Sequence, residues 1–295
     1  MHSAAHAATP IAAIPYAFCI NGEPDIDSHS PMPNCPYGPS TKAAAIEVID
    51  EAHEAGMQVM LKPQLFSDGG WIGHLDFPTA AEWDTFEMKY TNFIIEWAQI
   101  AEDKGVSLFC VGTELKIFVE ERPAYWSNLI REVREIYTGP LTYAANWDDY
   151  MDVPFWNDLD IVGVDAYFPL IKDKTPSVAD LKAAWQPYAG ALVAFQAQYQ
   201  KPIAFTEFGY MSVDSCGYNT WELEQKKDIM DINEQAQANA LQALLETYLV
   251  YNWWVGGFQW KWYADPLSAL CDGDVTKDYT PKDKLSSEVL KAMYE

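Results

Sequence analysis

The stretch SLFCVGTEL (residues 107–115) decides the fold class. Its body is almost continuously apolar, which is typical of a strand in a parallel sheet covered by helices on both faces. Glu114 lies next to its last residue, although a charged group is costly in an apolar interior unless it is paired or lies where the strand leaves the core. A second run of the same design, KPIAFTEFGY (201–210), carries Glu207 at the same point. The sequence therefore presents a pair of strand-end carboxylates.

Seven such apolar runs alternate with long helical patterns. They are IAAIPYAF (11–18), MQVMLKPQL (57–65), SLFCVGTEL (107–115), LTYAANW (141–147), DIVGVDAY (160–167), PIAFTEFG (202–209) and VGGFQWKW (255–262). This β-α-β-α order has no glycine-rich phosphate turn after its first strand, so it favours an α/β fold of the (β/α)8 TIM-barrel class over an open sheet. Because only seven strands are visible in the sequence, either the first strand and helix of the barrel are absent, which is the prediction, or an unrecognised segment closes the ring.

Local signals support this order of elements. Thr79 and Glu82 form a capping box before a helix that is predicted to end near Gly105. Within that helix a predicted core stripe recurs at helical spacing: Phe86, Tyr90, Phe93, Trp97 and Ile100. No composition break marks a second domain. Residues 1–295 are therefore predicted to form one catalytic barrel domain, with 1–9 a frayed N-terminus and 264–295 the final loop and C-terminal helix.

Composition narrows the classes of partner. The chain is 49% hydrophobic and 14% aromatic, with a net charge of −24, and no cluster of Lys or Arg occurs in it. A nucleic-acid backbone would be repelled, so no nucleic-acid partner is predicted. No apolar run reaches the length of a membrane span, so no membrane partner is expected. The first residues lack the features of an export signal, and the compartment stays open: an extracellular or periplasmic location fits if the N-terminus is truncated.

In a barrel of this class the active-site residues lie at the C-terminal ends of the strands. Those ends supply Tyr16, Lys62, Glu114, Asn146, Trp147, Asp165, Tyr167, Glu207, Trp260 and Trp262, and the loop SDGGWIGH adds Trp71. Two carboxylates with stacking rings suit the hydrolysis of a glycosidic bond, because one group protonates the leaving oxygen and the other attacks or activates water. Either glutamate taken alone could instead make a strand-end salt bridge or a cap.

Six stretches carry a more specific resemblance: VMLKPQL, DGGWIGHLDF, FCVGTEL, LTYAANWD, FWNDLDIVGVDAYFPL and KPIAFTEFGY. They resemble glycoside hydrolase family 113, known mainly as β-1,4-mannanases, within the large clan of retaining (β/α)8 glycosidases. The resemblance implies a hydrolase that cleaves β-1,4-mannosidic bonds in mannan or glucomannan by double displacement, with an oligo- or polysaccharide substrate and no cofactor. It also makes 107–115 the fourth barrel strand and 202–209 the seventh.

Carried over residue by residue, the resemblance implies that Glu114 is the general acid/base and Glu207 the nucleophile. Tyr167 would hydrogen-bond the nucleophile, and Trp260 would lie under the sugar at the cleavage point. Asn146 and Trp147 would contact sugar hydroxyls and a ring face. The chain departs from the clan at Thr113, where an asparagine usually precedes the acid/base, so the donor to the sugar 2-hydroxyl is open.

Other interpretations are kept beside this one. The chain could be an exo-acting β-mannosidase, another β-glycanase or a catalytically dead carbohydrate-binding barrel. A metal-dependent hydrolase is disfavoured because none of the five histidines lies at a strand end, and no metal site is predicted. Of the five cysteines, Cys110 is predicted to be a small buried thiol, while Cys216 could pair with Cys271 or with nothing.

Overall fold

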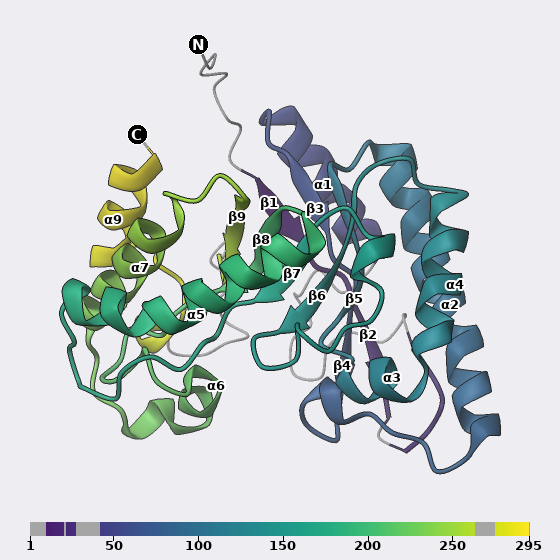
Figure 1. Cartoon of the computed structure of the whole chain (residues 1–295), viewed down its shortest axis with the longest axis horizontal. Helices are drawn as coiled ribbons and strands as arrows, with labels where there is room; N and C mark the ends of the chain where they lie inside the picture. The colour runs from purple at the N-terminus through teal and green to yellow at the C-terminus, as the bar shows by residue number, and fades with distance from the viewer. Residues whose placement is uncertain (1–9, 21, 28–41, 263–274, 295) are drawn as a thin grey trace. The chain divides into compact units, whose positions relative to one another are not determined.

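The computed structural model describes residues 10–20, 22–27, 42–262 and 275–294 (Figure 1). The chain divides into unit 1, residues up to 145 with 152–162, and unit 2, residues 146–151 with those from 163 onward. In chain order the first elements are β1 (Ile11–Ala13), β2 (Tyr16–Cys19), α1 (Lys42–Glu54), β3 (Val59–Leu61), β4 (Gln64–Ser67), η1 (Ile72–His74), α2 (Ala80–Lys104), β5 (Leu108–Thr113), α3 (Lys116–Glu121), α4 (Pro123–Arg134), β6 (Leu141–Asn146) and η2 (Trp156–Asp158). There follow β7 (Val162–Asp165), α5 (Val178–Tyr199), β8 (Ile203–Phe208), α6 (Thr220–Leu223), η3 (Glu224–Ile229), α7 (Glu234–Tyr248), β9 (Trp254–Gln259), η4 (Val275–Lys277) and α9 (Leu285–Tyr294).

Seven of the described strands follow the sheet order β1-β3-β5-β6-β7-β8-β9, and β2 pairs with β4 in a second sheet. The pairs β1–β3, β3–β5, β5–β6 and β8–β9 are all parallel. Parallel neighbours need crossover connections, and a helix or helices connect most consecutive strands of the seven. The seven predicted runs thus supply the seven strands of the larger sheet.

The first two predicted strands are each divided in two, and proline is the cause. The run 11–18 breaks at Pro15 and the run 57–65 breaks at Pro63, so that β1 pairs with β3 before the break and β2 with β4 after it. Proline has no backbone N–H and cannot donate to a ladder. One backbone hydrogen bond, from Gln64 N to Pro15 O at 2.9 Å, keeps the two segments in register across the break.

Unit 1 contains the predicted helix signals in full. Thr79 caps α2, its hydroxyl accepts a bond from Glu82 N at 3.3 Å, and Gly105 ends the helix with φ +65°. The predicted core stripe of α2 is buried throughout. Figure 1 shows α2 and α4 side by side. Ring contacts join a cluster of aromatic side chains from α2, α3 and α4, which touches β5 at Gly112: Trp83, Phe86, Tyr90, Phe118 and Trp126.

Unit 2 is built around the packing of α5, α7 and α9, which lie together in Figure 1. Trp185 of α5 and Tyr248 of α7 meet edge to face, with ring centroids 5.2 Å apart, and Tyr248 packs in turn on Phe205 of β8 at 4.7 Å. All three side chains are fully buried. Aromatic contacts of this geometry stabilise the packing beyond the area that they bury.

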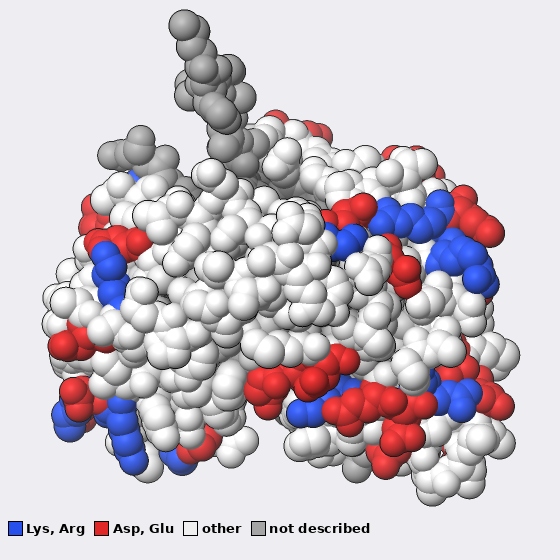
Figure 2. All heavy atoms as spheres, in the orientation of Figure 1, with Lys and Arg blue, Asp and Glu red and all other residues white. Residues whose placement is uncertain are grey.

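The face drawn in Figure 2 carries several separate groups of acidic side chains. On the face shown in Figure 2, small groups of Lys and Arg each lie beside Asp or Glu, and no extended basic area is visible. In unit 1, Arg122 forms ion pairs with both Asp84 and Glu87. Among the described residues no helix is long and apolar enough to cross a membrane. Cys110 and Cys216 are buried, whereas Cys271 lies outside the described residues.

Because many tyrosines are buried, the free energy of unfolding is expected to fall at high pH. Burial is the leading cause that raises the pKa above the ordinary value of a phenol for Tyr90, Tyr125, Tyr137, Tyr150, Tyr167, Tyr210, Tyr248 and Tyr279, reaching about 12 for Tyr137 and Tyr150. Above about pH 10 an unfolded chain releases these protons while the folded chain keeps them. The unfolded state then binds fewer protons, so the free energy of unfolding falls as the pH rises further.

Urea titrations at a series of pH values between about 8 and 12 measure this effect. We expect an unfolding midpoint that falls only above about pH 10, together with a rise in tyrosinate absorbance that coincides with unfolding. A gradual tyrosinate signal from all tyrosines near pH 10, in a protein that stays folded, would contradict the burial described above.

Candidate active site

The predicted site residues fall into two groups, one in each unit. Unit 1 holds Tyr16, Lys62, Trp71 and Glu114, and unit 2 holds Asn146, Trp147, Asp165, Tyr167, Glu207, Trp260 and Trp262.

Glu114 follows the last residue of β5 in a left-handed backbone conformation, with φ +52°. Its N–H still donates to Ala144 O at 2.8 Å, and the next N–H, that of Leu115, donates to the hydroxyl of Tyr143 at 2.8 Å. The register between β5 and β6 shifts just before this point, between Cys110 and Thr113. A non-glycine residue in this conformation costs free energy and persists only where its surroundings hold it. The bulge and the two hydrogen bonds supply that restraint and turn Glu114 out of the strand.

Gly112 lies at the register shift, at a point where a larger residue would be too close to two buried rings. A Cβ atom at this position would lie 2.8 Å from the indole of Trp126 and 2.9 Å from the hydroxyl oxygen of Tyr90. Both rings belong to the buried aromatic cluster, and Tyr90 also donates to Val111 O at 3.0 Å. The cluster therefore packs directly against the backbone of β5, two residues before Glu114.

Trp71 and Glu114 are brought together in unit 1. The indole N–H of Trp71 donates to Glu114 Oε2 at 2.5 Å, and the ring meets His74 edge to face at 5.0 Å. The indole folds over Gly73, where a Cβ would approach it to 2.5 Å. Glycine at position 73 thus lets the tryptophan reach the carboxylate. His74 is exposed.

The other two residues of unit 1 lie along the divided strands. Tyr16 begins β2 opposite Gln64 and is half-buried. Lys62 lies between β3 and β4, its N–H donates to Ala13 O at 2.9 Å, and its side chain is fully buried. Their contact with a sugar stays a prediction.

Glu207 lies within β8 in unit 2 and is only 8% exposed. Tyr167, just beyond the end of β7, donates its hydroxyl to Glu207 Oε2 at 2.8 Å, as predicted. Burial, and after it the charge of Glu207, raises the pKa of Tyr167 well above that of a free phenol. Tyr167 therefore keeps its proton, and stays a donor to the carboxylate, at pH values at which a free phenol ionises.

Asp165 and Thr206 form the neighbouring contact. The hydroxyl of Thr206 donates to Asp165 Oδ1 at 2.8 Å, and both side chains are fully buried. A threonine precedes each predicted catalytic glutamate. The one before Glu207, Thr206, binds Asp165 at the end of β7. Asp165 thus joins β7 to β8 beside Glu207, and its side chain is inaccessible to solvent.

Trp260 follows β9 and lies close to the end of β8. Its N–H donates to Phe208 O at 2.7 Å, and its carbonyl oxygen would lie 2.4 Å from a Cβ on Gly209. Glycine at 209 therefore permits this approach. The half-buried Trp260 is predicted to lie under the sugar, whereas Trp262 is 57% exposed and no contact joins it to the other predicted site residues of unit 2 among those described.

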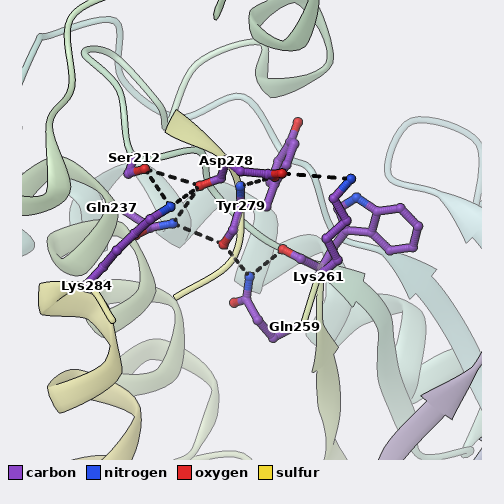
Figure 3. A network of polar contacts seen from close by, with 8 residues as sticks. Ser212, Gln237, Gln259, Lys261, Asp278, Tyr279 and Lys284 are labelled. Carbon is purple, nitrogen blue, oxygen red and sulfur yellow. Dashed lines mark hydrogen bonds and ion pairs between the residues drawn. The ribbon is translucent and has the colours of Figure 1, made fainter. Parts of the chain in front are cut away.

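A buried polar network holds the C-terminal segment against these strand ends (Figure 3). Lys284 Nζ donates to Ser212 Oγ and to Asp278 O, both at 2.8 Å, and Gln237 Nε2 lies 3.0 Å from Tyr279 O. Gln259 Nε2 lies 3.3 Å from the same carbonyl oxygen. The network fixes Tyr279, whose ring packs on Tyr167 with centroids 6.4 Å apart.

Tyr279 was not among the residues predicted from the sequence. It lies in a segment without a strand or a long apolar run, so the strand-end rule has no signal for it. Trp221 was also missed: it stacks on Trp147 with ring centroids 5.5 Å apart. Asn146 Oδ1 accepts a bond from Trp147 N at 2.9 Å, which holds the start of this loop.

The sequence model of Glycoside Hydrolase Family 113 matches residues 38–284, which is most of the chain. The chain belongs to glycoside hydrolase family 113. Membership places it among the glycoside hydrolases, as the resemblance implied. A search of curated proteins found no match. Among the described residues no group of three or more His, Cys, Asp and Glu side chains could hold a metal ion.

Solved structures of the family are similar to this chain. The complex structure of a family 113 β-1,4-mannanase is 27% identical, covers 98% of this chain and 87% of its own, and has a TM-score of 0.78. A second family 113 β-1,4-mannanase structure is 28% identical over 97% of this chain and 87% of its own, also at 0.78. The family 113 β-mannanase of Alicyclobacillus acidocaldarius, in complex with ManMIm, is 23% identical. It covers 94% of this chain and 84% of its own, with a TM-score of 0.76. The likeness confirms the predicted fold class, a (β/α)8-type barrel with seven parallel strands in the described part of the chain.

A Gly112→Ala substitution tests the packing behind Glu114. The added methyl group must displace the buried ring of Trp126 or the hydroxyl of Tyr90, and overpacking of this kind destabilises a protein by about 1–3 kcal/mol. Thermal and urea unfolding of the variant measure the loss.

Gly190→Ala is the matched control. Gly190 lies in α5, is exposed, and has no atom within 4 Å of a Cβ built on it. The same added methyl group should there stabilise the protein by about 0.5–1 kcal/mol through helix propensity. Equal stability changes in the two variants would show that the contact at Gly112 is not tight.

Proposed function

We propose that this chain is a retaining glycoside hydrolase that cleaves β-1,4-mannosidic bonds in mannan or glucomannan. The observation that carries the proposal is the environment of Glu207, a buried carboxylate at a strand end that accepts a hydrogen bond from Tyr167 at 2.8 Å. Membership of family 113 and the β-1,4-mannanases among the similar structures support the substrate class.

Glu207 is proposed as the nucleophile. In double displacement its carboxylate attacks the anomeric carbon, the bond to the leaving oxygen breaks, and a covalent glycosyl-enzyme forms. The hydroxyl of Tyr167 donates to Oε2 and restrains the orientation of the carboxylate. Because Tyr167 keeps its proton, it can stabilise the anion before attack and again as the ester bond breaks.

Glu114 is proposed as the general acid/base. It would protonate the leaving oxygen in the first step and remove a proton from the attacking water in the second. The indole N–H of Trp71 donates to Glu114 Oε2, so this carboxyl group is also restrained by a ring donor. Trp71 therefore orients Glu114 in the proposal and need not contact the sugar.

Paired substitutions distinguish the two roles. Glu114→Ala is expected to lower kcat on β-mannan about a hundred- to ten-thousandfold, as loss of a general acid does. An aryl β-mannoside with a good leaving group needs no protonation, so its first step should survive in this variant, and added azide should accelerate turnover. Glu207→Ala is expected to lose activity on both substrates. Retention is checked by following the anomer first released by the wild type with NMR.

The outcomes separate the alternatives. Activity on aryl β-mannoside with none on polymers would indicate an exo-acting enzyme, and activity on another β-glycan would change the substrate class. A folded wild type that is inactive on mannan, glucomannan, cellulose, xylan and aryl β-mannoside would contradict the proposal and favour a binding barrel.

A Tyr167→Phe substitution tests the hydrogen bond on its own. Removing a donor to a charged acceptor costs about 1.5–3 kcal/mol, so we expect kcat to fall about ten- to hundredfold. Tyr137→Phe is the matched control: the hydroxyl of Tyr137 is also buried and donates to Val106 O at 2.6 Å, but Val106 precedes β5 rather than following a strand. That variant should lose stability and keep kcat, whereas equal kcat losses in both variants would argue against a role for Tyr167 at the nucleophile.

A further inference from the structure

Trp221 in α6 is the feature of unit 2 that the proposed mechanism leaves unused. Its side chain is 45% exposed, and its indole stacks on that of Trp147 with an interplanar angle of 20°. Trp147 also packs against the buried Phe168, with centroids 5.9 Å apart. The two tryptophans and Phe168 thus form a stack that begins in the core and ends on an exposed indole.

The stack changes the role of Trp147. With Trp221 stacked on it and Phe168 packed beside it, much of its ring surface is occupied, and Trp147 is only half-exposed. The broad apolar surface that remains at this position belongs to Trp221. Trp147 therefore supports the outer ring.

The backbone holds Trp221 outward. The hydroxyl of Tyr279 donates to the carbonyl oxygen of the neighbouring Thr220 at 3.1 Å. Thr220 and Leu223, on the same short helix, are both buried. Asn219, just before the helix, has φ +48°, and its Nδ2 donates to Glu222 Oε1 at 2.9 Å. A left-handed residue before a helix anchored at Thr220 and Leu223 leaves the indole little freedom to fold back.

The loop that precedes α6 is also restrained by hydrogen bonds. Leu170 N donates to Gly217 O at 2.7 Å, Ser215 N donates to Lys174 O at 3.0 Å, and Cys216 between them is fully buried. An aromatic ring held in this way loses little conformational entropy when a ligand packs on it.

Contacts within unit 2 connect this ring to the proposed nucleophile. Tyr279, which holds the carbonyl of Thr220, packs on Tyr167, the donor to Glu207. Phe168, at the base of the stack, is the next residue after Tyr167. The exposed ring is therefore positioned by the same residues that position the carboxylate.

We propose that Trp221 is a stacking platform for a sugar ring of the bound chain, away from the cleavage point, and that it favours long β-1,4-linked chains over short ones. The inference rests on the proposed function, because it assigns the platform to that substrate. An indole face carries partial negative charge, and the C–H groups of a pyranose face carry partial positive charge, so the two pack well. An uncharged glycan also meets no repulsion from a chain with a net charge of −24.

The test compares Trp221→Ala and Trp221→Tyr with the control Ile229→Ala. Ile229 lies in the same segment, is 84% exposed and carries no ring. For Trp221→Ala we expect KM on mannohexaose and mannan to rise about tenfold with kcat unchanged, since one lost ring contact is worth about 1.4 kcal/mol. Aryl β-mannoside kinetics should be unaltered, Trp221→Tyr should be intermediate, and Ile229→Ala should match the wild type.

Two results would overturn the inference while leaving the proposed function intact: kinetics of Trp221→Ala equal to those of Ile229→Ala on long and short substrates, or equal losses on aryl β-mannoside and on polymer. Circular dichroism and thermal unfolding confirm that each variant is folded.

Affinity electrophoresis of the wild type and Trp221→Ala, in gels containing galactomannan, glucomannan, hydroxyethylcellulose or xylan, covers the case in which no β-mannan is cleaved. Retardation of the wild type that Trp221→Ala abolishes would support the platform, for whichever glycan retards it, even if the proposed activity fails. Absence of retardation in every gel, or equal retardation of both proteins, would overturn it.

Discussion

The hydrogen bond from Tyr167 to Glu207 is the contact on which much of the candidate site in unit 2 depends. A carboxylate that is 8% exposed needs a partner, because desolvation of an unpaired charge costs several kcal/mol. The partner must also stay a donor, and the burial of Tyr167 ensures this by raising its pKa. Its ring packs on Tyr279, whose main chain is held by two buried side chains: Lys284 donates to Asp278 O and Gln237 donates to Tyr279 O (Figure 3).

In unit 1, Glu114 is positioned in a different way. There the backbone itself is restrained in an unfavourable conformation, with φ +52°, and the restraint comes from a strand bulge and an aromatic cluster packed against Gly112. Two carboxylates of the same chemical type are thus positioned by different means, one by a side-chain donor and the other by the path of the chain. Each has one carboxylate oxygen held by a ring donor, the phenol of Tyr167 or the indole of Trp71.

Short-range signals in the sequence were sufficient for most of the fold. The capping box at Thr79, the left-handed Gly105 and the buried stripe of α2 depend on residues a few positions apart, and the structure confirms them. The division of the first strands at Pro15 and Pro63 was not predicted, although a missing N–H at each proline carries the necessary signal. Strand ends also located Glu114, Glu207 and Tyr167. Tyr279 and Trp221 lie outside any strand, and their contacts join segments far apart in the chain, so no local pattern could indicate them.

The network around Lys284 has a consequence for anyone who redesigns the chain. The strand pattern alone suggests that the fold is complete at β9, and a boundary drawn there would look conservative. It would remove Tyr279, the carbonyl oxygens that Gln237 and Lys284 bind, and the hydroxyl that holds Thr220. Such a shortened chain would keep every strand of the sheet and both proposed catalytic glutamates, yet it would lose the outer support of Tyr167. Residues 275–286 therefore support Tyr167 from outside the strands, and grafting or trimming should treat them as part of the candidate site.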